Sequence, residues 1–363
     1  MRLLPLATGL LAASTVSFAA SAADTRGFVL DWFHIATLSG DESCPDGLYP
    51  LSETFYTREL NRLGYAPDEI EELLKDFPNG GYMEPIINRG RIDGKPVNVY
   101  AYPWSQPDPE VTLVTGKRAY GFNLDGQVSE NDFIEPETGE DGIDNQLYRA
   151  LGCFQSYTGV LPERPGLHQI YWDIQRDYMP AWLIEVTGID DFQNDDAVQI
   201  GFYRAFGPVK RDATGNVRAD TTMWVDPDPR LQNVVSARIE NGEVKTNGAF
   251  EFRMLGNPMF MAEYRLNNAQ ARFHFTEEGR LHGVLAGYQP WMDVYYGNFG
   301  SQGWATEHSA GVDFPGAYYA LKKLADGEPD PETGENTAIS GSFWIEAVPA
   351  FLMRRDNEVA AAR

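Results

Sequence analysis

Cysteine is nearly absent from this sequence, with two residues in a chain of 363. That number excludes a small domain held together mainly by disulfides, a c-type haem bound through Cys-x-x-Cys-His, and a four-cysteine iron–sulfur cluster. Lysine is also scarce, with 7 residues against 22 arginines. With 53 acidic residues and a net charge of −24, the chain lacks the excess of positive charge that nucleic-acid binding needs. We therefore expect no nucleic-acid partner.

Long hydrophobic runs are missing as well. A membrane-spanning helix needs about 20 apolar residues, and no segment of the chain reaches that length, so we expect no membrane span. Residues 1–22 contain one positive charge, Arg2, then an apolar stretch, and end in Ala20-Ser21-Ala22. This pattern is typical of a cleavable signal peptide. It predicts a periplasmic or secreted protein that begins after Ala22.

Export changes the interpretation of the two cysteines. An oxidising compartment favours a disulfide between Cys44 and Cys153. In the chain-entropy model, a loop of this length is worth on the order of 4–5 kcal/mol of stability. A reactive thiol is the alternative, but no histidine signature accompanies either cysteine.

The hydrophobic fraction of 43% and the charged fraction of 23% are those of a globular protein. Residues 23–196 form a mixed, loop-rich region, in which we expect a short strand at 111–114 and helices that start near Pro67, at 144–151 and at 168–186.

From residue 197 to 353 the pattern is β-rich, with one late helix at 316–325 and a final strand at 341–351. Asn241-Gly242 is a strong hairpin signal, because both residues tolerate the positive φ of a type I′ turn. Residues 354–363 are expected to form a tail. The predicted fold class is α+β: a mixed N-terminal part followed by an antiparallel β-sandwich or barrel-like sheet.

The segment 123–132 places oxygen-bearing side chains around a glycine, and calcium takes 6–8 oxygen ligands. In its ligand positions, turn glycine and apolar anchor, it resembles the calcium loop of dockerin modules, which are relatives of the EF-hand. It differs at the first ligand position, which is Gly121, and no helix is expected after it. We expect a structural Ca²⁺ site with ligands from Asn123, Asp125, Asp132, Asp141, Asp144 and Asn145. A solvated turn is the alternative, and the acidic loop 326–336 is a further candidate.

His274 and His282 flank a turn signal at residues 277–279. A three-residue loop with Gly279 in the left-handed region would place the two histidines opposite each other, where they could bind a transition metal. A two-residue loop would place them on opposite faces. A solvent-facing or hydrogen-bonded pair without metal is the alternative.

Aromatic side chains gather between residues 288 and 304. They could form a platform for a glycan or another small ligand, and core filling is the alternative. The residues in question are Tyr288, Trp291, Tyr295 and Trp304. Asp293, Glu307 and His308 lie in or after this segment and are the candidate catalytic residues of a hydrolase.

The strong catalytic motifs are missing: the sequence has no G-x-S-x-G elbow, P-loop or G-x-G-x-x-G fingerprint. We therefore favour a ligand-binding or interaction module of the cell envelope or exterior over an enzyme. A secreted hydrolase, possibly acting on glycans, is the alternative, and an envelope structural protein is a third hypothesis. Taken as a whole, the chain resembles no family of known activity.

Overall fold

A computed structural model describes residues 23–38, 42–78, 80–158, 172–174, 176–257 and 261–354. The expected signal peptide and all but the first residue of the expected tail lie outside the described residues. Within the described part, no helix combines the length and apolar character needed to cross a membrane.

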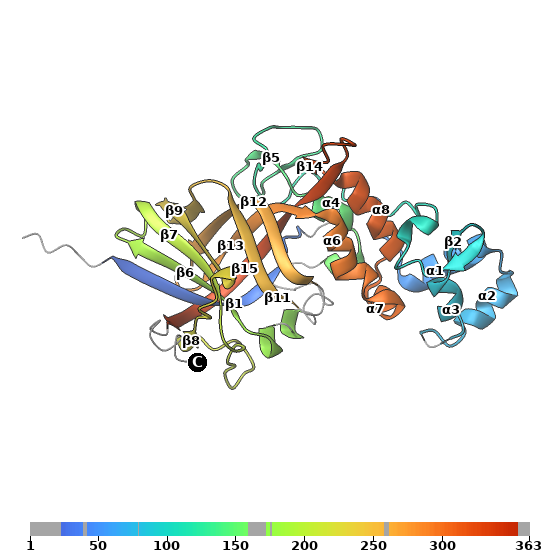
Figure 1. The fold of residues 1–363 in the computed structure, drawn as a ribbon, viewed down its shortest axis with the longest axis horizontal. Coiled ribbons are helices and arrows are strands. Elements are labelled where there is room, and N and C mark those ends of the chain that lie inside the picture. Colours follow the sequence, from blue (N-terminus) through green and yellow to red (C-terminus); the bar gives the residue numbers. More distant parts are fainter. Residues whose placement is uncertain are drawn as a thin grey trace, which may run out of the picture.

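One large antiparallel sheet dominates the structure (Figure 1). Its main strands follow one another in the order β1, β6, β7, β9, β10, β12, β13 and β15. Because β1 pairs with β6 on one side and with β15 on the other, the sheet closes into a barrel. In that order the strands are Asp24–Ile35, Trp182–Ile189, Asn194–Arg204, Gln232–Glu240, Glu243–Thr246, Met261–Phe275, Leu281–Pro290 and Asn336–Met353.

Alternation of side chains explains how the closed sheet fills its interior. Successive residues of a strand point to opposite faces, so every second residue faces inward. Ile184 and Val186 of β6, Phe273 of β12, and Phe343 and Ile345 of β15 belong to one buried hydrophobic core. The β-branched and aromatic residues of these strands lie on the inward face, so side chains fill the interior of the closed sheet.

Shorter strands complete the sheet. β11 (Phe250–Asn257) pairs with the first part of β12, while β10 pairs with the second part. The side chain of Asn233 on β9 accepts from and donates to the backbone of Arg253, which joins β9 to β11. β8 (Thr221–Trp224) runs parallel to the end of β15, and β14 (Gly327–Pro329) pairs with its beginning. Two small hairpins lie apart: β2–β3 (Gly90–Ile92, Lys95–Val97) and β4–β5 (Phe133–Ile134, Asp141–Ile143).

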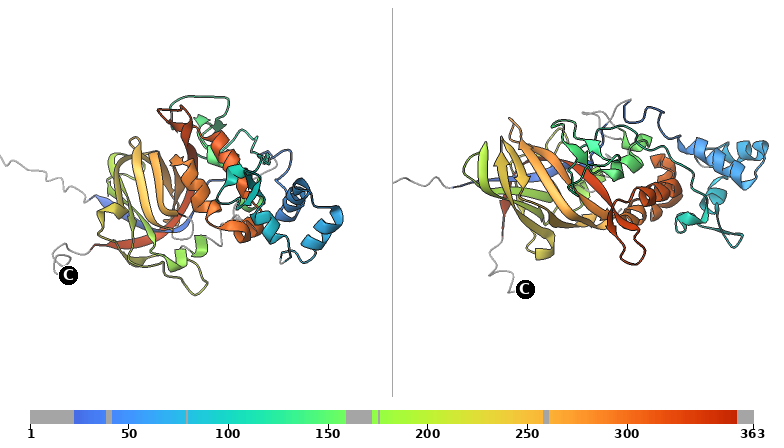
Figure 2. Two further views of the ribbon diagram at one scale, coloured as in Figure 1. Left: turned by 45° about the vertical axis from the view of Figure 1, so that its right-hand side comes forward. Right: turned by 90° about the horizontal axis from the view of Figure 1, so that it is seen from above.

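Helices gather beyond one end of the closed sheet (Figures 1 and 2). Next to the sheet lie α4 (Gln146–Leu151), α6 (Trp291–Tyr295), α7 (Gly303–Ala310) and α8 (Phe314–Leu324), with the π-helical turn η4 (Tyr296–Gly300) between α6 and α7. Farther out lie α1 (Ser52–Leu63), α2 (Pro67–Leu74) and α3 (Met83–Ile87). Short 3₁₀ turns are η1 (Pro103–Ser105), η2 (Gln155–Tyr157) and η3 (Pro229–Leu231).

The α+β class and the antiparallel sheet are confirmed. The turn at Asn241-Gly242 is also confirmed, with φ of 53° and 82°, and it joins β9 to β10 as expected. The sheet additionally recruits β1 and β6, which precede residue 197.

The expected helix at 168–186 is confirmed only in part. Residues 172–174 and 176–178 are helical, while 168–171 and 175 lie outside the described part. From Trp182 onward the chain forms β6 instead, because pairing with β1 and β7 overrides the local apolar pattern. The expected strand at 111–114 has no ladder partner, although the backbone N–H of Val114 donates to the carbonyl of Arg149.

Candidate functional site

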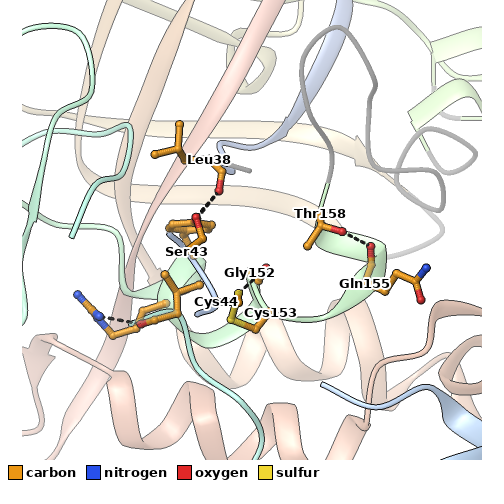
Figure 3. Close-up of a disulfide and its surroundings, with 10 residues drawn as sticks. Leu38, Ser43, Cys44, Gly152, Cys153, Gln155 and Thr158 are labelled. Carbon is orange, nitrogen blue, oxygen red and sulfur yellow. Dashed lines mark hydrogen bonds between the residues drawn. A yellow bond between two sulfur atoms is a disulfide. The ribbon is translucent and has the colours of Figure 1, made fainter. Parts of the chain in front are cut away.

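The predicted disulfide between Cys44 and Cys153 is confirmed, with a Cα–Cα distance of 5.9 Å (Figure 3). It ties the segment after β1 to the residues after α4. Hydrogen bonds reinforce this junction: the hydroxyl of Tyr148 donates to Ser43 Oγ at 2.9 Å, and the Tyr49 N–H donates to the carbonyl of Cys153. The disulfide thus holds the helical region against the beginning of the chain.

The acidic segment 121–145 lies against the outer face of β12, β13 and β15. Its Leu124 packs with Val284, Ala286, Tyr288 and Ala338 in a small hydrophobic cluster. Glu135 is fully buried and forms an ion pair with Arg272 of β12 at 2.6 Å. The Asn268 side chain donates to the carbonyl of Leu124 at 2.8 Å. The sheet therefore fixes this loop in place.

Several predicted calcium ligands shape the turns of this segment. Asp125 accepts from the Gln127 N–H, Asp132 from the Ser129 N–H and hydroxyl, and Asp141 from the Gly142 N–H. Asn145 accepts from the Tyr148 N–H and so caps α4. All are local hydrogen bonds, and apart from the one from the Ser129 hydroxyl they join a side chain to the backbone, as is usual in turns and helix starts.

Asn123 and Asp144 differ from the others. Asn123 donates to the Gln127 carbonyl, but its buried Oδ1 has no hydrogen-bond partner. Asp144 is only 4% exposed, and its Oδ2 accepts from the N–H groups of Leu124 at 2.7 Å and Asp125 at 3.3 Å. Asn123 and Asp144 therefore each have an oxygen atom that the hydrogen bonds of the turn do not use.

The two acidic loops, distant in sequence, meet on this face. Asp326 accepts from the backbone N–H and the hydroxyl of Ser340, at 2.7 and 2.6 Å. The same hydroxyl accepts from the N–H of Gln146 at 3.0 Å, so Ser340 links Asp326 to the first residue of α4, two positions after Asp144. The loop at 326 thus reaches the loop that ends at 145.

The acids of the two loops also act on one another electrostatically. Burial raises the pKa of Asp144 to about 7, and repulsion from Asp125 and Asp326 adds to this effect. Burial likewise raises the pKa of Asp326 to about 6, again with a contribution from Asp125. The same acids act on Tyr288. Its pKa is raised mainly by burial, and the charges of Asp144 and Asp326 add to this effect.

No three His, Cys, Asp or Glu side chains in the described ranges are already arranged to hold a metal ion. The donor set consists of carboxylate, amide and hydroxyl oxygens, which are the ligands that calcium prefers. The chemistry of the residues fits calcium, while Asp125, which is exposed, would have to turn toward Asp144 to complete a site.

The aromatic segment 288–304 lies mostly in the core. Tyr288, Trp291 and Tyr295 are buried, and Trp304 is half-buried. Trp291 and Tyr295 pack edge-on against Tyr318 of α8, at 5.3 Å between ring centroids in each case.

The exposed rings next to this core come from η1, which the sequence did not single out. Trp104 is 49% exposed and lies 6.2 Å from the ring of Tyr318 and 5.7 Å from that of Tyr102. Tyr102 is 44% exposed. A continuous series of rings therefore runs from the core to the surface, and it is distributed over three separate segments of the chain.

The candidate catalytic residues occupy different environments. Asp293 is exposed on α6, and His308 on α7 is near Ser52, with Nδ1 3.3 Å from the serine hydroxyl. Glu307 is fully buried. Its carboxylate accepts from Arg89, from the backbone N–H of Phe314 at 3.0 Å, and from the hydroxyls of Tyr56 and Tyr100 at 2.9 and 2.6 Å.

A second buried carboxylate lies next to Glu307. Asp313 accepts from Tyr49 at 2.8 Å, from Arg58 at 3.0 Å and from the Gly316 N–H, which caps α8. Burial raises its pKa to about 6, with a further contribution from Glu307. Together these two acids join α7 and α8 to the outer helices.

Comparison with family models, with curated proteins and with solved structures finds no match for this chain.

Proposed function

We propose that this chain is an exported ligand-binding or interaction module whose two acidic loops, 123–145 and 326–336, take up a structural calcium ion. The observation that carries the proposal is the contact between the two acidic loops: the Ser340 hydroxyl donates to Asp326 and accepts from the N–H of Gln146, two residues after Asp144. The charge of Asp125 acts on both carboxyls. Neighbouring carboxylates that repel one another are stabilised when a divalent cation enters between them.

The residues suited to hold the ion are those with oxygen atoms turned toward the cluster. Asp144 and Asp326 are anchored by backbone N–H groups, Asp125 is exposed enough to move, and Asn123 contributes an amide oxygen without a partner. Bound calcium would neutralise the acids and fix the two loops to each other. It would have no part in any reaction.

A module that binds ligands also needs a recognition surface. Tyr102 and Trp104 supply exposed rings; Trp104 packs against Tyr318, and Tyr102 packs against Trp104. Aromatic faces of this kind stack against the apolar faces of sugars and other small ligands. We place the ligand contact of the module at these rings, next to the 288–304 segment.

The hydrolase alternative gains no support from Glu307. A general acid or nucleophile must reach a substrate, and this carboxylate is enclosed by four hydrogen-bonding groups. Its contacts describe a structural role in joining helices.

Calcium titration of the mature, untagged chain tests the proposal. We expect CaCl₂ at about 1 mM to raise the melting temperature by several degrees relative to the same sample in EGTA. Mg²⁺ should give a much smaller shift. Asp144→Asn combined with Asp326→Asn should abolish the response. Asp196→Asn, which removes an exposed acid from β7, serves as the control and should keep it. A wild-type melting temperature unmoved by calcium would refute the calcium part of the proposal.

Ligand binding is tested separately by tryptophan fluorescence against a panel of oligosaccharides. A saturable change that disappears in Trp104→Ala, and persists in Trp224→Ala, is the expected result. No response to any member of the panel would argue against a glycan ligand.

A further inference from the structure

His274 and His282 lie directly opposite each other on the outer face of the closed sheet. Phe275 pairs with Leu281, and the Thr276 N–H donates to the carbonyl of Arg280 at 2.9 Å, which leaves 277–279 as a three-residue loop with Gly279 in the left-handed region at φ 75°. This register pairs His274 with His282, and their ring centroids are 5.6 Å apart. The condition set by the sequence for a facing pair is therefore met.

Carboxylates flank this pair on both sides. Glu243 of β10 pairs with His274, and Glu346 of β15 pairs with His282. Directly opposed residues of antiparallel strands point to the same face, so the four side chains form one row: Glu243, His274, His282, Glu346. His274 Nε2 lies 3.2 Å from Glu243 Oε1. A further acid, Glu137 of the neighbouring loop, acts electrostatically on His282.

Two imidazoles with carboxylates beside them form a ligand set for zinc, copper or nickel, and the row contains no thiol. His274 is reachable, because 40% of its side chain is exposed. His282 is half-buried and lies directly opposite His274 in the strand register.

Other groups hold the carboxylates at present. Lys245 forms an ion pair with Glu243, and the indole N–H of Trp344 donates to Glu346 at 3.2 Å. Zinc–nitrogen bonds are about 2.0–2.1 Å long, so the two imidazoles must turn toward each other to share one ion. Side-chain rotation suffices for this, since the strands already set the backbones opposite each other.

We propose that His274 and His282 chelate one divalent transition-metal ion on the outer face of β12 and β13, with Glu243 or Glu346 as a third ligand and water completing the shell. The site uses different residues and a different metal class from the calcium site, and it stands whether or not the acidic loops bind calcium.

Zinc binding to the mature chain, freed of any affinity tag and stripped with EDTA, tests this site. Isothermal titration with ZnCl₂ should give one site per chain. His274→Gln and His282→Gln should each weaken its affinity at least tenfold, and Glu243→Gln or Glu346→Gln should weaken it less. Glu278→Gln, in the connecting turn but outside the row, should leave the affinity unchanged. Circular dichroism of each variant checks that it is folded.

A spectroscopic measurement identifies the ligands. Cu²⁺ bound to the wild-type chain should show hyperfine coupling to imidazole nitrogen by electron paramagnetic resonance, and the coupling should disappear in the double histidine variant. Wild-type zinc affinity in that double variant would overturn the site. So would zinc binding that is lost only in Asp144→Asn with Asp326→Asn, because the ion would then lie in the acidic loops.

Discussion

Arg89 and Glu307 form a two-point ion pair with both side chains fully buried: Nη2 to Oε1 is 2.7 Å, and Nη1 to Oε2 is 3.3 Å. Arg89 follows α3 and Glu307 lies on α7, so the pair joins the outer helices to those next to the sheet. Because the Tyr56 and Tyr100 hydroxyls and a backbone N–H complete the hydrogen bonds of the carboxylate, the charge is well compensated.

Loss of the Glu307 charge should therefore destabilise the protein strongly. Glu307→Gln leaves the Arg89 guanidinium buried without its counter-charge, and we expect a loss of about 3–5 kcal/mol in the free energy of unfolding. Urea denaturation followed by circular dichroism measures it. Glu71→Gln, at an exposed position of α2, is the matched control and should change stability by less than about 0.5 kcal/mol. Equal stability of the two variants would contradict a stabilising role for the Arg89–Glu307 ion pair.

The raised pKa values of Asp144 and Asp326 predict how stability depends on pH without calcium. Their carboxyls titrate at about 7 and about 6 in the folded chain, against an ordinary value of 3.8. The folded state thus binds protons that the unfolded state has released. The stabilisation is complete below pH 4 and is lost as the pH rises toward 7.

Melting curves in EGTA between pH 4 and pH 8 measure this dependence. Asp144→Asn with Asp326→Asn should flatten it, and calcium at pH 7 should restore stability to the wild type. A residual slope near pH 6 is expected from Asp313, whose pKa is also raised to about 6. A profile identical in wild type and double variant would show that these two acids are not the source.

The disulfide should contribute measurably to stability. Cys44→Ala with Cys153→Ala removes a cross-link between residues separated by 109 positions, and we expect a loss of about 2–5 kcal/mol. Reduction of the wild type with dithiothreitol should reproduce the loss, while the double variant should not respond to the reductant. A wild type that unfolds at the same urea concentration with and without reductant would disprove the contribution.

Two tryptophans should separate core from surface in the aromatic region. Trp291 is 8% exposed, so Trp291→Ala should cost about 3–5 kcal/mol through lost burial and the remaining cavity. Trp104 is half exposed, and Trp104→Ala should change stability much less, by roughly 1 kcal/mol or below. Thermal unfolding of both variants measures the difference. Similar losses would place Trp104 in the core and remove it as a ligand contact.

The features that sequence reasoning predicted are local ones. Asn241-Gly242 specifies its own turn through backbone conformation, and the helix expected at 144–151 forms as α4. Its cap by Asn145, which was expected as a calcium ligand, is a finding of the structure. The disulfide followed from having two cysteines, with no other pairing available, and from the expectation that the chain is exported.

Sequence reasoning did not predict the contacts between segments that are distant along the chain. Trp182–Ile189 carries an apolar pattern that suits a helix or a strand, and only pairing with β1 and β7 decides for the strand. The approach of Asp326 to Asp144 depends on β14 and β15 running beside the acidic loop. Nothing near Glu307 in sequence reveals the buried Arg89, which lies 218 positions earlier.

The seam between β1 and β15 has a consequence for the order of folding. The first and the last strand of the chain lie side by side, so the ring of strands stays open until nearly the whole chain is present (Figure 1). Contacts so distant in sequence slow folding. A chain cut before Asn336 would leave β1 and β13 each with an exposed edge, ready to pair with a neighbouring molecule. Premature truncation should therefore yield aggregates in place of a smaller folded domain.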